Sequence, residues 1–144
     1  MQVLFYVLNQ QDEPGFQVPA HFNFACQIIA DLFSRGRRVF VFTDNQEDAH
    51  QIDELLWGFD PERFIPHNLA GEGPKQGAPI EISWLPPTNR RMTLINLSTN
   101  TPGFINQFNE IIDFVPADDT LKQQARARYV NYRQKGCQLS TTQV

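Results

Sequence analysis

The first part of the chain alternates between continuous apolar runs and amphipathic segments. The run VLFYVL at 3–8 has no polar interruption, which predicts a strand buried on both faces. Residues 19–35 repeat apolar side chains at helical spacing and stop before Gly36, a residue suited to a helix C-terminus. A second buried strand is predicted at 37–43. This strand–helix–strand order is typical of a parallel sheet.

A second helix is expected to begin at Asp44, with Glu47 three residues later completing a capping box. Its apolar stripe consists of Ile52, Leu55, Leu56 and Phe59. Trp57 falls about 150° from the centre of this stripe, so its ring should point away from the core. Either the folded domain covers that ring, or Trp57 is an exposed anchor for a partner, and Phe64 could extend the same patch.

The middle of the chain holds further strand candidates. Residues 80–84 (IEISW) and 93–98 (TLINLS) alternate more like strands of a mixed sheet. Residues 104–109 are expected to form a short helix that leads directly into a strand at 110–115. Pro116 ends that strand.

The last helix is expected to run from a cap at Asp118 or Asp119 to about Lys135, closed by Gly136. The tail after Gly136 is predicted as a short strand or coil. Residues 1–144 are therefore expected to form one domain of the α/β class. Its architecture should be an α/β sandwich with a mostly parallel (mixed) sheet.

Charge is distributed unevenly along the chain. The formal net charge is −4, which disfavours broad contact with a nucleic-acid backbone. Residues 1–117 carry 7 basic and 14 acidic side chains, a net −7, whereas residues 118–144 carry 5 basic and 2 acidic ones, a net +3. The short basic segment therefore favours a local anionic partner.

Cysteine usage and the N-terminus bear on where the protein works. Cys26 and Cys137 form no motif with each other, which favours a reducing compartment and leaves one disulfide open. The first residues have no basic region before their apolar run, and no apolar run reaches membrane-spanning length. A cytoplasmic protein is expected.

Residues 66–79 (PHNLAGEGPKQGAP) contain three glycines and three prolines. Such a segment could be a phosphate-binding loop of an enzyme or a rigid surface for a larger partner. Gly71, Gly73 and Gly77 fit neither a dinucleotide fingerprint nor a P-loop, and Glu72 would repel a phosphate. The three histidines are isolated in sequence: His21, His50 and His67. No catalytic set, metal site or cofactor is therefore expected, and the loop is interpreted as a rigid surface.

The last predicted helix has one basic face with an aromatic residue in its middle. Lys122, Arg126, Tyr129 and Arg133 follow one another at spacings of four, three and four. Such a face is often only solvated. Alternatively, an arginine can hold a carboxylate while the neighbouring ring contacts an apolar side chain. The face therefore suits an acidic peptide with a hydrophobic end.

Two long blocks carry a family resemblance: FIPHNLAGEGPKQGAPIEISW (64–84) and IIDFVPADDTLKQQARARYVNYRQKG (111–136). They resemble the chi subunit of bacterial DNA polymerase III holoenzyme, and the likeness extends back through IDELLW (52–57) to the N-terminal strand and helix. It is weaker at 85–91 and after Gly136. The resemblance implies a three-layer α/β/α sandwich, which resembles nucleotide-binding folds. It also implies a clamp-loader accessory subunit that acts in DNA replication without catalysis or cofactor of its own.

The resemblance also implies partners. Such subunits pair with the psi subunit, which tethers them to the clamp loader, and bind the acidic, Phe-ending tail of single-stranded-DNA-binding protein. Nucleic acid is then contacted only indirectly. The tail-binding residues carry over to Lys122, Arg126, Tyr129 and Val115, and the psi-facing surface to Trp57 and Phe64. A repair helicase uses that second surface in some relatives.

Two other functions remain as alternatives. A nucleotide-dependent enzyme or switch could use the same fold, with its ligand near the loop at 66–79. A direct binder of single-stranded DNA would need more positive charge and several exposed aromatic rings.

Overall fold

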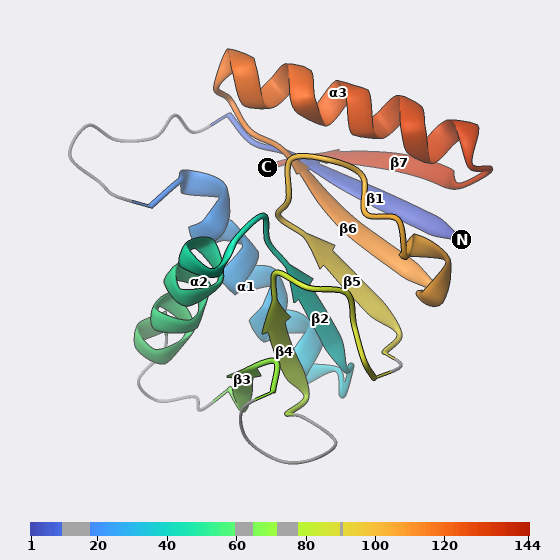
Figure 1. The fold of residues 1–144 in the computed structure, drawn as a ribbon. Helices are drawn as coiled ribbons and strands as arrows, with labels where there is room; N and C mark the ends of the chain where they lie inside the picture. Colours follow the sequence, from blue (N-terminus) through green and yellow to red (C-terminus); the bar gives the residue numbers. More distant parts are fainter. Residues whose placement is uncertain (10–17, 60–64, 72–77, 90) are drawn as a thin grey trace.

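The fold is an α/β sandwich built on one seven-stranded sheet (Figure 1). The computed structural model describes residues 1–9, 18–59, 65–71, 78–89 and 91–144. Its elements are β1 (Gln2–Val7), α1 (Ala20–Ser34), β2 (Val39–Phe42), α2 (Gln46–Phe59), β3 (His67–Leu69), β4 (Ile80–Ser83), β5 (Thr93–Asn96), the 3₁₀ turn η1 (Ile105–Gln107), β6 (Glu110–Val115), α3 (Asp119–Gln134) and β7 (Gln138–Gln143). No described helix is both long and apolar enough to cross a bilayer.

The strand order is β3-β4-β2-β5-β6-β1-β7, and every described pairing is parallel. The predicted α/β class and mostly parallel sheet are confirmed. The antiparallel contribution expected from 80–84 and 93–98 is not found, because β4 and β5 both pair in parallel with β2. All four residues of each strand are buried, so the alternation there does not reflect one exposed face.

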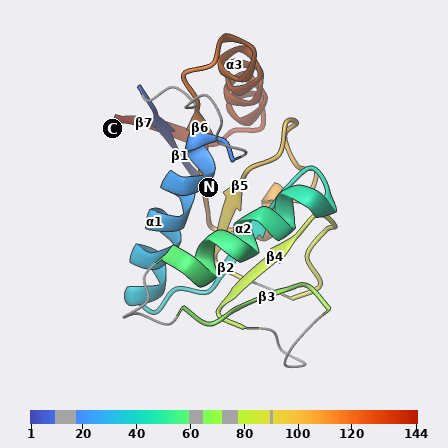
Figure 2. The same ribbon diagram turned by 90° about the vertical axis from the view of Figure 1, so that its left-hand side faces the viewer.

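Helices cover both faces of the sheet (Figures 1 and 2). α1 and α2 lie on one face, over the larger apolar cluster, and α3 lies on the other. β1 contributes side chains to both layers, because successive residues of a strand point to opposite faces of the sheet. Val3 and Phe5 pack in the cluster under α3, whereas Tyr6 packs against the cluster under α1. The expected three layers are therefore present.

The helix ends follow local chemistry. Gly36 and Gly136, with φ of 75° and 85°, lie just beyond α1 and α3 as expected. Asp118 caps α3, accepting a hydrogen bond of 3.0 Å from the backbone N–H of Leu121. The cap of α3 is therefore Asp118 and not Asp119, the two candidates that the sequence offered.

The predicted cap of α2 is wrong by one residue. Asn45, not Asp44, accepts the hydrogen bond from the N–H of Asp48, at 2.8 Å. The Asp44 carboxylate instead accepts two hydrogen bonds from Thr99, at 2.8 and 2.6 Å. Asp44 therefore links the start of α2 to the loop after β5, whereas the side chain of Asn45 caps the helix.

A buried ion pair joins α3 to the sheet. Arg128 of α3 donates from Nε and Nη2 to both oxygens of Asp113 on β6, at 3.0 Å each, and Asp113 is fully buried. Tyr132 donates to the same carboxylate at 2.8 Å, and Asn96 at 3.2 Å. Burial, together with the Asp113 charge, raises the pKa of Tyr132. The carboxylate is thus satisfied by three side chains, two of which, Arg128 and Tyr132, fix α3 over β6.

We expect Asp113→Asn to lower the free energy of unfolding by about 3–5 kcal/mol, because it leaves the buried Arg128 guanidinium without its counter-charge. Urea denaturation followed by circular dichroism measures this. Glu110→Gln is the matched control. Its ion pair with Arg37 has side chains 30% and 35% exposed, so we expect a loss below about 1 kcal/mol. Equal losses in both variants would contradict the prediction.

The two cysteines are both free, so the disulfide left open by the sequence is absent. Burial raises the pKa of the Cys26 thiol to about 12, whereas Cys137 is only half-buried. Because the thiolate is the reactive form, we expect a thiol reagent at pH 8 to label one cysteine per native chain quickly and the second only after unfolding. Mass spectrometry of labelled peptides checks this, and early labelling of Cys26 would contradict it.

Candidate functional site

The basic face of α3 places charge directly beside an apolar cluster. Arg126 is exposed and Lys122 is half-buried. Tyr129 is also half-buried, with its ring 5.5 Å from that of Phe5. Val115, at the end of β6, packs against the same cluster. The structure therefore brings the four residues predicted for tail binding to one side of the sheet.

Not all of the positive charge in the last segment reaches the surface. Of its five basic side chains, Arg128 is turned inward and neutralised by Asp113. At about 100° per residue, Arg126 lies about 160° around α3 from Arg128. Within the described residues, the Arg126 guanidinium makes no ion pair or hydrogen bond. It is therefore available to an external carboxylate.

Trp57 lies near the end of α2 and is 58% exposed, as its distance from the apolar stripe predicts. Its ring contacts that of His67 on β3, with centroids 4.7 Å apart. His67 is buried, and its Nδ1 lies 2.7 Å from the carbonyl oxygen of Ile65. Phe64, the other residue predicted for this surface, lies outside the described residues.

The Gly- and Pro-rich segment contains a strand that sequence reasoning missed. β3 pairs in parallel with β4, His67 opposite Ile80, but its three residues are too few to show a periodic pattern. Asn68 Oδ1 accepts a hydrogen bond of 2.7 Å from the N–H of Ala78, which ties together the two ends of the loop. Gly71 has φ of 87°, a conformation that other residues rarely adopt. The remaining predicted loop residues, 72–77, lie outside the described part of the chain.

A small cavity of about 140 Å³ lies at the carboxyl ends of β5 and β6, where ligands bind in many parallel α/β folds. Asp44 and Asp48 line it, and burial, with the nearby Asp44 and Glu47, raises the pKa of Asp48. Its one cation, Arg128, is already paired. Within the described residues, this cavity is therefore small and mostly acidic, which disfavours a nucleotide phosphate there.

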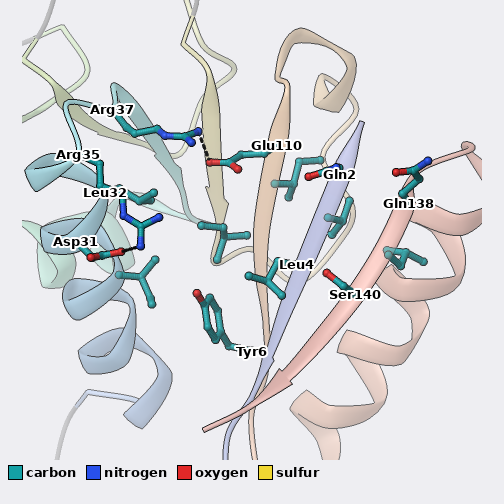
Figure 3. Close-up of a pocket in the computed structure, with 15 residues that line it drawn as sticks. Gln2, Leu4, Tyr6, Asp31, Leu32, Arg35, Arg37, Glu110, Gln138 and Ser140 are labelled. Atoms are coloured by element: carbon teal, nitrogen blue, oxygen red, sulfur yellow. Dashed lines mark hydrogen bonds and ion pairs between the residues drawn. The ribbon is translucent and has the colours of Figure 1, made fainter.

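A larger groove of about 410 Å³ runs along the open face of β1 and β7, beside α1 (Figure 3). Its polar lining includes Gln2 and Tyr6 from β1 and Gln138 and Ser140 from β7. Desolvation, followed by the charge of Asp31, raises the pKa of Tyr6.

The charged residues of this groove are paired with one another: Arg35 with Asp31 at 2.9 Å and Arg37 with Glu110 at 3.0 Å (Figure 3). The groove thus offers hydrogen-bonding groups without an activated nucleophile beside a base. Within the described ranges, no group of three or more His, Cys, Asp or Glu side chains is placed to hold a metal ion.

Comparison with known proteins agrees with the resemblance in the two sequence blocks. Residues 1–140 match the family described as DNA polymerase III chi subunit, HolC. A DNA polymerase III subunit chi from Haemophilus influenzae is 48% identical over 122 residues, covering 83% of this chain and 85% of the relative.

Two further relatives carry the same name. The one from Escherichia coli is 42% identical over 139 residues, covering 95% of this chain and 94% of its own. The one from Pseudomonas aeruginosa is 32% identical over 136 residues, covering 94% and 91%. Because the match extends over nearly the whole chain, this protein belongs to the family of DNA polymerase III chi subunits.

Proposed function

We propose that this chain is a non-catalytic subunit that connects two proteins of the bacterial replication machinery in the cytoplasm. One partner is the psi subunit, which links it to the clamp loader. The other is the acidic C-terminal tail of single-stranded-DNA-binding protein. The observation that carries the proposal is the basic face of α3, where the unpaired Arg126 lies on the same side of the sheet as the half-buried Tyr129.

The proposed tail site combines two kinds of recognition. Arg126 and Lys122 supply positive charge for Asp side chains and for the terminal carboxylate of the tail. Tyr129 and Val115 extend the apolar cluster under α3 to the surface, where the terminal Phe of the tail can pack. An arginine can bind a carboxylate through two parallel hydrogen bonds, which fixes the direction of the peptide as well as attracting it.

The proposed psi-facing surface lies on the other side of the sheet. Trp57 is 58% exposed on α2, and a large exposed aromatic is the residue type most often found at the energetic centre of an interface. We include Phe64 on the basis of the family resemblance. A repair helicase using this surface is a second candidate, and it would compete with psi for Trp57.

The tail site is tested by titrating the purified chain with a fluorescent acidic peptide ending in Asp-Ile-Pro-Phe. We expect Arg126→Ala to weaken binding about tenfold or more, because a charge-assisted contact is lost. Binding to the wild type should weaken as salt is raised from low ionic strength. Fluorescence anisotropy measures both effects.

Arg35→Ala is the matched control, since it removes an exposed arginine at the C-terminal end of α1 while changing the net charge equally. It should leave peptide affinity within about twofold. If both arginine variants weaken binding equally, net charge rather than the α3 face controls binding. If neither variant differs from the wild type, the tail binds elsewhere.

The psi-facing surface is tested by co-expression with psi and by calorimetry. We expect Trp57→Ala to weaken the complex by about tenfold or more, as for a hot-spot aromatic, and to leave binding of the acidic peptide unchanged. An unchanged complex with psi would reject this surface. Loss of both activities would indicate misfolding rather than a local contact.

A further inference from the structure

We infer that His67 is a positioning residue that holds the Trp57 ring in place for its partner, an inference that rests on the proposed role of Trp57 at the psi-facing surface. The His67 side chain is only 1% exposed, so it is not itself available to a partner. Its imidazole contacts the exposed indole of Trp57, with ring centroids 4.7 Å apart and ring planes inclined by 56°.

The imidazole is held by a hydrogen bond at one of its nitrogens. Nδ1 lies 2.7 Å from the carbonyl oxygen of Ile65, and because a carbonyl only accepts, Nδ1 carries the proton and donates it. Nε2 lies 3.2 Å from Asp53 Oδ1 but makes no hydrogen bond. The hydrogen bond to the Ile65 carbonyl therefore fixes where the ring lies.

Asp53 and Trp57, two residues of α2 that His67 contacts, lie close together on the helix. The two residues are four apart on α2, so they are neighbours on one helix face. His67 reaches that face from β3 and contacts both of them. One buried side chain thus connects strand β3 to the turn of α2 that carries the exposed ring.

Restraining an exposed tryptophan has a consequence for binding. A side chain that is already ordered before association loses less conformational entropy when the complex forms. We therefore expect His67→Ala to weaken the complex with psi about 2- to 10-fold, the range that corresponds to ordering one side chain. Binding of the acidic peptide at α3 should not change, because that face lies on the other side of the sheet.

The partner-independent test uses Trp57 fluorescence. The chain has two tryptophans, so Trp84→Phe leaves Trp57 as the only tryptophan, which is excited selectively at the red edge of the absorption band. In that background we expect His67→Ala to speed ring motion in the anisotropy decay and to increase quenching by acrylamide, since one side of the indole loses its cover. His67→Phe keeps an aromatic contact without the polar ones and should restore slow ring motion and most of the psi affinity.

Leu69→Ala is the control for general damage to β3, because Leu69 is a buried core residue of the same strand. It should lower stability but leave the anisotropy decay of Trp57 unchanged. Unchanged ring motion in His67→Ala, or equal loss of psi binding in His67→Phe and His67→Ala, would overturn the inference. If Trp57→Ala binds psi normally, the proposed surface fails instead, whatever the fluorescence shows about His67.

Discussion

The orientation of α3 depends on a single buried carboxylate, Asp113. Apolar packing alone would tolerate small rotations of a helix over a sheet, because dispersion contacts have little directionality. A bidentate arginine has a fixed geometry, and Tyr132 adds a third directional bond one turn further along. Since replacing a buried ion pair by apolar side chains is often neutral for stability, we attribute to this pair the setting of α3 rather than a large net stabilisation.

This setting decides which arginine is available for binding. Leu121, Ala125 and Tyr132 fall within about 60° of Arg128 around α3, so they face the sheet together. Arg126, two residues earlier, is then directed away from the sheet, and Tyr129 lies at the boundary between the two. The two proposed partner surfaces consequently lie on opposite faces of the sheet, one on α3 and one on α2 (Figure 2). Two partners could then bind these surfaces at the same time without overlapping.

Much of this arrangement could be predicted from the sequence, because it is encoded in local patterns. The buried apolar runs predicted β1 and β2, and glycines and caps predicted the ends of α1 and α3. Helical spacing predicted both the basic face and the exposed Trp57. The inward position of Arg128 was missed because two arginines separated by one residue, Arg126 and Arg128, look alike in sequence. An aspartate inside the apolar strand IIDFV was the available signal, since a buried charge requires a partner. β3 and the contact of His67 with Trp57 depend on pairing between distant segments, which no local pattern contains.

The buried network also occupies the end of the sheet at which ligands bind in many parallel α/β folds. In related architectures, polar groups at the carboxyl ends of the strands face a ligand. In this chain Asn96, Asp113 and Arg128 occupy that end but hydrogen-bond to one another and to the loop carbonyl of Thr99. A phosphate would have to displace Asp113 from Arg128, leaving a buried carboxylate without its counter-charge. The polar groups at this position instead fix a helix, and the two surfaces that we propose for recognition lie on the outer faces of α2 and α3.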